Sequence, residues 1–175
     1  MGGYGESPRV GSGGVGERQR GSAAALTVRV IALVQTHPMD AHQALLTAAA
    51  VHAGFQATIT LVTYPMLVAT PAATWAQVHA GHYRRINPVV ALVYGAVVAA
   101  WVWVFTGGGV GLALWVAAAG SVITGTTTAF RAAPTHTLLR RQGPRPELLR
   151  RLIRADRVRF VGALLTFGGA LIAVW

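Results

Sequence analysis

Four stretches of the chain are almost free of charge and lack the polar stripe, repeating about every 3.6 residues, that a soluble helix presents to water. A run of about 20 apolar residues forms a helix long enough to cross the ~30 Å hydrocarbon layer of a bilayer. These stretches occupy residues 44–68, 88–105, 110–130 and 158–175. Their pattern predicts an all-α, polytopic membrane protein built as a four-transmembrane-helix bundle.

Two segments beside these spans have amphipathic patterns. Thr70 followed by proline resembles a helix start, so residues 71–86 are predicted to form either a helix in the membrane interface or a continuation of the second span kinked at Pro88. Asn87 is predicted to cap the second span, with Pro88 at its first helical position. Residues 146–159 are predicted to form an amphipathic helix that leads into the fourth span.

The chain divides into a polar N-terminal segment and one transmembrane domain. Residues 1–38 begin with a stretch rich in Gly, Ser and charge, so this extension is predicted to be disordered or non-native. Met39 stands directly before the first convincing span, and we hypothesise that it is the natural start. Residues 39–175 then form a single four-helix domain.

Composition supports a membrane location and indicates how the chain is oriented across the membrane. Charged residues make up 11% of the 175 residues, whereas a soluble domain carries roughly 25%. The loops 69–87 and 131–157, with Arg159, hold 11 arginines against two acidic residues. Basic residues stay on the cytoplasmic side of a membrane. We therefore expect an inner-membrane protein with cytoplasmic basic segments and both termini outside.

The net charge of +10 does not indicate a nucleic-acid partner, because the arginines cluster between apolar spans and the aromatic residues lie mainly inside those spans. The chain has no cysteine, which excludes disulfides, thiolate metal ligands and cysteine nucleophiles.

His52 and Gln56 are polar residues one helical turn apart within the first span. Polar groups at membrane depth commonly mark functional sites, so His52 is a candidate base or ligand that Gln56 would orient. The structural alternative is hydrogen bonding between helices. Its candidate partners are the threonines of the third span, Thr124, Thr126, Thr127 and Thr128.

His79 and His82 are three residues apart on a predicted helix, a spacing that allows two imidazoles to meet one metal ion. His136 and Asp156 are expected on the same membrane side, so the group could bind Zn, Fe or Cu, or no metal at all. Interfacial histidines without a ligand role are the alternative. His52 is expected to lie too far along its helix to join them.

Asp156 is either a catalytic carboxylate or one half of a salt-bridged junction with Arg154 or Arg157. Tyr83 is a further catalytic candidate because it precedes two arginines that could hold an anionic substrate or a lipid phosphate. The predicted lipid- or anion-binding residues are Arg84, Arg85, Arg150, Arg151 and Arg154.

The layout resembles the anthrone-oxygenase-like group of small four-span bacterial membrane proteins over about residues 40–175. The resemblance rests on a Tyr-Pro break in the first span (Tyr64-Pro65), a segment bearing His79, His82 and Tyr83, the Pro134/His136 segment, and Asp156 with Arg159. It implies an oxygenase acting on a hydrophobic aromatic substrate.

These features lead to two functional hypotheses. The first is a membrane-embedded oxidoreductase of the oxygenase type, acting on a hydrophobic small molecule with histidines as base or metal ligands. The second is a non-enzymatic scaffold or accessory subunit that binds anionic lipid and either a partner membrane protein or further copies of itself.

Overall fold

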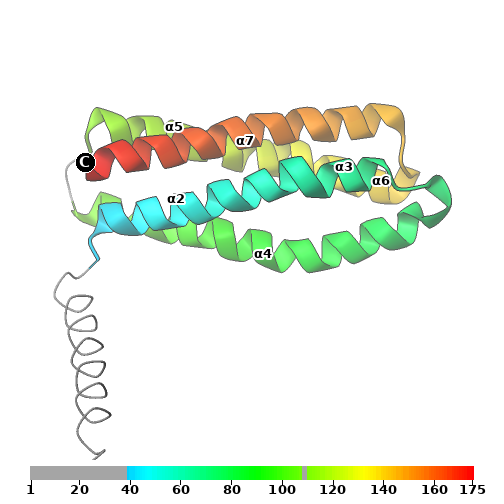
Figure 1. Cartoon of the computed structure of the whole chain (residues 1–175), viewed down its shortest axis with the longest axis horizontal. Coiled ribbons are helices and arrows are strands. Elements are labelled where there is room, and N and C mark those ends of the chain that lie inside the picture. The colour runs from blue at the N-terminus through cyan, green and yellow to red at the C-terminus, as the bar shows by residue number, and fades with distance from the viewer. Residues whose placement is uncertain (1–38, 108–109) are drawn as a thin grey trace, which may run out of the picture. The chain divides into compact units, whose positions relative to one another are not determined.

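The computed structural model describes residues 39–107 and 110–175, and residues 40–175 form one compact unit. Within those ranges every regular element is helical, and Figure 1 shows the long helices lying side by side. The N-terminal extension 1–38, expected to be disordered or non-native, lies outside the described residues.

Four helices are long and apolar enough to cross a membrane, which confirms the predicted fold class. The first contains α2 (Ala41–Thr58), η1 (Ile59–Thr63) and α3 (Tyr64–Val68); the second is α4 (Ala72–Gly107); the third contains α5 (Leu112–Thr127), η2 (Thr128–Ala132) and α6 (Ala133–Gln142); and the fourth is α7 (Pro146–Val174). Each is longer than its predicted span, with 28, 36, 31 and 29 residues. At 1.5 Å per residue, about 20 residues suffice to cross, so the helices extend beyond the hydrocarbon layer.

The boundary predicted at Asn87 and Pro88 is wrong, because α4 runs through both residues as one helix. The prediction of a continuation into the second span is the correct alternative for residues 71–86. A proline removes one backbone donor, and membrane helices tolerate this where neighbouring groups can satisfy the freed backbone. At the fourth span, the predicted amphipathic segment joins the apolar span without a break, as α7 shows.

Two π-helical segments, η1 and η2, interrupt the first and third long helices. Each begins six residues before a proline, Pro65 in the first case and Pro134 in the second. A proline ring collides with the carbonyl group four residues earlier, which here belongs to a π-helical residue in both helices. The wider turn accommodates this conflict and lets each helix continue to the end of the bundle.

The helices α5 and α7 pack against each other most extensively, and α2 contacts both α7 and α4. Glycines allow the close approach of α5 and α7. A Cβ atom added to Gly120 would lie 2.5 Å from the carbonyl oxygen of Gly162, and one added to Gly169 would lie 2.5 Å from that of Ala113. Small residues let membrane helices pack backbone to backbone, where lipid provides no hydrophobic driving force.

The interior consists of two apolar clusters with a polar layer between them. One cluster includes Leu45, Val104 and Leu114, and the other includes Trp75 and Leu152. The intervening layer consists of buried His52, Gln56, Thr124, Asp156, Arg159 and Thr166. The layer follows from the order of these residues along α2, α5 and α7, and it places two buried charged groups between the apolar clusters.

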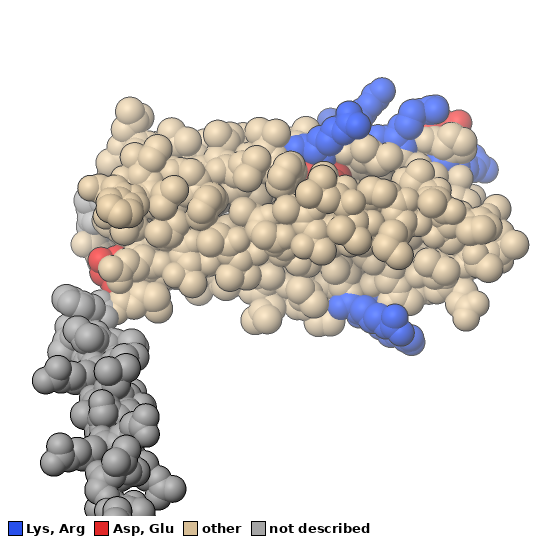
Figure 2. Space-filling model, viewed as in Figure 1, with Lys and Arg blue, Asp and Glu red and all other residues tan. Residues whose placement is uncertain are grey.

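The outer surface divides into an apolar part and a basic part. Large apolar side chains such as Leu92, Val122 and Ile172 are 62–74% exposed, which suits contact with lipid and would be costly in water. Figure 2 shows basic side chains over one half of the bundle's length on the visible face, with none over the other half. The predicted separation of apolar spans from arginine-rich segments is therefore present in three dimensions.

Replacing Gly120 with alanine should destabilise the bundle by about 1–3 kcal/mol, because the new methyl group would overlap the backbone of α7. Thermal unfolding of the detergent-purified protein measures this effect. Gly125→Ala is the matched control on the same helix, since a Cβ there meets no atom within 4 Å. Equal unfolding temperatures for the two variants would contradict the close packing of α5 and α7.

Candidate functional site

A buried ion pair lies at the centre of the polar layer. Arg159 Nη2 donates to Asp156 Oδ1 at 2.9 Å, and both residues project from α7 one turn apart. Gln56 Nε2 on α2 donates to the same carboxylate oxygen at 2.7 Å. Asp156 is 2% exposed and Arg159 is 7% exposed. A buried carboxylate and guanidinium need each other, because either charge alone would carry a large desolvation cost.

The expected junction between Asp156 and Arg154 or Arg157 is wrong. Both arginines are exposed, and Arg159 is the partner of Asp156. Residues three apart share a helix face, so Arg159 points to the interior with the carboxylate.

A chain of hydrogen bonds leaves this ion pair towards α4 and α6. Arg159 Nη2 donates to the hydroxyl oxygen of Tyr64 at 2.9 Å. That hydroxyl lies 3.3 Å from His136 Nε2, and His136 Nδ1 lies 3.2 Å from His79 Nε2. The His79 ring stacks on Trp75, with ring centroids 5.2 Å apart. The chain therefore joins side chains of α7, α3, α6 and α4.

The guanidinium group of Arg159 determines which atom donates in the first hydrogen bond of this series. Arginine can only donate, so the Tyr64 oxygen accepts from Arg159 and its own hydrogen is available for His136 Nε2. In the tautomer that accepts from Tyr64 at Nε2, His136 carries its hydrogen on Nδ1 and donates to His79 Nε2. A sequence of donors and acceptors in one direction provides a route for moving a proton between the ends of the chain.

A cavity of about 140 Å³ adjoins this chain. Its polar lining comes from Tyr64, His82, Tyr83, Asn87, Thr128, His136 and Arg159, and its apolar lining from Phe55, Ile59, Ile86, Val90, Ala132 and Ala133. A cavity of roughly 150 Å³ can accommodate benzene. The space therefore matches a single ring, with polar groups available on its wall.

Both π-helical segments border this cavity. Ile59 of η1, and Thr128 and Ala132 of η2, line it, and Tyr64 follows η1 directly. Such segments are frequent at functional sites because they alter which side chains face the interior. The two proline-linked turns thus form part of the cavity wall.

His52 is buried apart from the hydrogen-bonded chain. Both of its ring nitrogens lack a hydrogen-bond partner among the described residues, and its ring meets Tyr94 edge-on with centroids 4.8 Å apart. Gln56 bonds to Asp156 at 2.7 Å, and no hydrogen bond joins it to His52, so the predicted orienting role is wrong. Tyr94 in turn pairs with Thr128 at 2.8 Å.

The threonines proposed as partners of His52 and Gln56 bond elsewhere. Thr124, Thr126 and Thr128 each donate to the carbonyl oxygen four residues earlier on their own helix. A threonine hydroxyl reaches this carbonyl easily within its own helix, and only Thr124 and Thr128 of these three also form a hydrogen bond with a group on a neighbouring helix among the described residues.

His82 and Tyr83 lie beside His136, with ring centroids 6.4 and 6.0 Å from it. The three histidines predicted as metal ligands are thus neighbours. The Nε2 atom of His79 and the Nδ1 atom of His136 lie 3.2 Å apart, within hydrogen-bond distance of each other. Across residues 39–107 and 110–175, no group of three or more His, Asp or Glu side chains is placed to hold a metal ion. Metal ligation by His79, His82 and His136 stays a prediction without support from this geometry.

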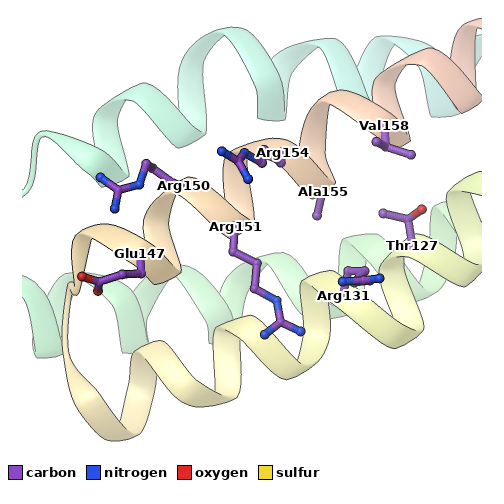
Figure 3. Close-up of a pocket in the computed structure, with 8 residues that line it drawn as sticks. All are labelled: Thr127, Arg131, Glu147, Arg150, Arg151, Arg154, Ala155 and Val158. Carbon is purple, nitrogen blue, oxygen red and sulfur yellow. The ribbon is translucent and has the colours of Figure 1, made fainter.

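The predicted lipid-binding arginines belong to two regions. Arg150, Arg151 and Arg154 line a large groove together with Arg131, a residue that the sequence did not indicate (Figure 3). Arg84 and Arg85 are exposed on α4 outside that groove.

Sequence reasoning also did not assign functions to Tyr64, Arg159, Trp75 or Tyr94. Tyr64 entered only as part of the family resemblance, and Arg159 entered only there and in the count of basic residues. The Tyr-Pro pair at an interruption of the first span was the available signal for Tyr64. For Arg159 it was the three-residue spacing from Asp156.

The fold and the buried centre define a multi-pass membrane protein with an ionisable network at a ring-sized cavity. No family model matches the chain, and no curated protein or solved structure matches it. The resemblance to the anthrone-oxygenase-like group therefore stays a prediction.

Replacing Arg159 with glutamine should destabilise the protein by about 3–5 kcal/mol, because it leaves the Asp156 carboxylate buried without its counter-ion. The double variant Asp156→Asn/Arg159→Gln should recover part of this loss, since no isolated charge remains. Thermal unfolding in detergent measures both effects. The control is Arg157→Gln, an exposed residue on the same helix. Unfolding of Arg159→Gln at the temperature of that control would show that the pair is not essential.

Proposed function

We propose that this protein is a membrane-embedded oxidoreductase of the oxygenase type that acts on a hydrophobic molecule with a ring-sized, hydroxyl-bearing head. The observation that carries this proposal is the hydrogen-bonded chain from Arg159 through Tyr64 and His136 to His79 at the wall of the 140 Å³ cavity. The mainly apolar lining suits a substrate that enters from the bilayer. The polar groups on the wall would fix its oxygen atom.

An unpaired donor gives the cavity a preference for an oxygen-bearing ligand. Arg159 borders the cavity, and its buried Nε–H has no hydrogen-bond partner among the described residues. An unsatisfied buried donor of a charged group is costly, so a substrate oxygen that accepts from it would be favoured. The same positive charge would stabilise an oxyanion formed from a hydroxyl group.

The hydrogen-bonded side chains also provide an acceptor for the proton that the substrate hydroxyl releases. A substrate hydroxyl beside Tyr64 would give its proton to the tyrosine oxygen while Tyr64 passes its own to His136 Nε2. His136 would then be held as an imidazolium by the hydrogen bond from its Nδ1 to His79. Histidine suits this role because one ring nitrogen can accept a proton while the other donates a hydrogen bond.

Dioxygen is the oxidant in the reaction class that the resemblance implies. A ring C–H beside the ionised hydroxyl is replaced by C=O, one atom of dioxygen enters the ring, and the other leaves as water. The proton held by His136 returns through Tyr64 and completes the water molecule. These residues would hold the substrate and move protons.

Replacing His136 with glutamine should reduce oxygen uptake by about 100-fold or more, since general acid–base groups typically contribute at least that factor. The assay uses 4-alkylphenols with the full chain in phosphatidylcholine nanodiscs, an oxygen electrode, and mass spectrometry of the product. His42→Gln, near the opposite end of the first helix, is the control. The scaffold alternative predicts no phenol-dependent uptake by the unaltered protein.

A second pair of variants tests the cavity itself. Val90→Phe would fill space on the cavity wall, whereas Val89→Phe alters the adjacent residue, which is 41% exposed and does not line the cavity. Uptake should fall with the first variant and persist with the second. Equal uptake by both would place the reaction elsewhere.

We also infer that the arginine-rich end of the bundle lies in the cytoplasm and that both termini lie outside an inner membrane. All described arginines fall between residues 84 and 159, at or beyond one end of the apolar spans, and the positive-inside tendency supports this orientation. A reporter placed in the connection 143–145 should be active only as a cytoplasmic fusion. Periplasmic activity of that fusion would reverse the orientation.

A further inference from the structure

A basic groove of about 810 Å³ lies between α7 and the third long helix, away from the cavity described above (Figure 3). Arg150, Arg151 and Arg154 reach it from α7, and Arg131 reaches it from η2. In Figure 3, Arg151 extends from α7 towards the helix that carries Arg131. Two elements distant in sequence therefore contribute four arginines to the lining of one groove.

The charges in this groove are not balanced by the protein. Glu147 is the one acidic residue in its lining, against four arginines. Among the described residues, the ion pair recorded is the buried Asp156–Arg159 pair, which lies outside the groove. Arg150 and Arg154 are one turn apart on α7, where like charges repel. An anionic ligand would relieve this repulsion and accept paired hydrogen bonds from the guanidinium groups.

One end of the groove is apolar and continues onto the lipid-facing surface. Thr127, Ala155 and Val158 form that end of the lining. Val161 and Leu165 follow Val158 at successive turns of α7, and both are exposed. An occupant with its anionic part among the arginines would find an apolar path along α7 for hydrocarbon chains. A free phosphate would not use that path.

The number of guanidinium groups indicates more than one phosphate. A phosphodiester carries one negative charge and can accept from two guanidinium groups, so four arginines match two phosphodiesters. Basic pockets between membrane helices on the cytoplasmic side commonly hold such headgroups. We propose that this groove binds one anionic phospholipid whose headgroup contains two phosphodiesters.

The proposal can be tested by native mass spectrometry of the full chain released from nanodiscs. The discs contain phosphatidylcholine with either diphosphatidylglycerol or phosphatidylglycerol, at equal total lipid charge. The unaltered protein should retain one diphosphatidylglycerol molecule and little phosphatidylglycerol. The variant Arg151→Gln/Arg154→Gln should retain at least tenfold less diphosphatidylglycerol.

Arg84→Gln/Arg85→Gln is the matched control, since it removes the same charge from exposed positions outside the groove. It should retain diphosphatidylglycerol like the unaltered protein. Equal losses in the two double variants would reduce the effect to general charge attraction and overturn the proposal. Equal retention of both lipids, or displacement of the lipid by inorganic pyrophosphate, would also overturn it. Thermal unfolding in phosphatidylcholine alone should be the same for all three proteins, because the substituted side chains are exposed.

Discussion

In the middle of the bundle, the carboxylate of Asp156 and the guanidinium of Arg159 share a setting with little water to stabilise either charge. The guanidinium also reaches the Tyr64 hydroxyl, and the carboxylate also accepts from Gln56. These two bonds attach two segments of the first long helix, α2 and α3, to α7. Because an unpaired charge at this depth is costly, the pair constrains how α2, α3 and α7 can pack together.

The same constraint connects the fold to the proposed chemistry. Arg159 holds Tyr64 in a position where its hydroxyl meets His136, and His136 meets His79 on the longest helix. The Asp156–Arg159 pair lies between the two apolar clusters, and Tyr64, which continues the network, belongs to the second cluster. Arg159 lines the cavity, and its buried Nε–H has no hydrogen-bond partner among the described residues, so this network keeps unused hydrogen-bonding capacity next to the cavity.

The sequence allowed prediction of four apolar helices, the segregation of arginines and the entry of residues 146–159 into α7, because these depend on hydropathy alone. It did not allow the helix bounds to be predicted well, since Pro88 normally ends a helix in water but lies inside α4. The partner of Gln56 is 100 residues away in sequence. Helical periodicity says which face a residue occupies but not which helix meets that face, so the separate predictions for Gln56 and Asp156 did not reveal their contact.

The number of residues in each π-helical segment determines the direction in which the side chains after it point. An α-helix turns by about 100° per residue, so one extra residue in a turn sets the helical phase of everything that follows. Tyr64 follows η1, and His136 follows η2. A relative of this chain that lacked one residue in either segment would keep its hydropathy profile, its four spans and its arginine distribution. It would nevertheless turn one of these two side chains away from the other, so composition alone cannot reveal whether such a relative retains the network.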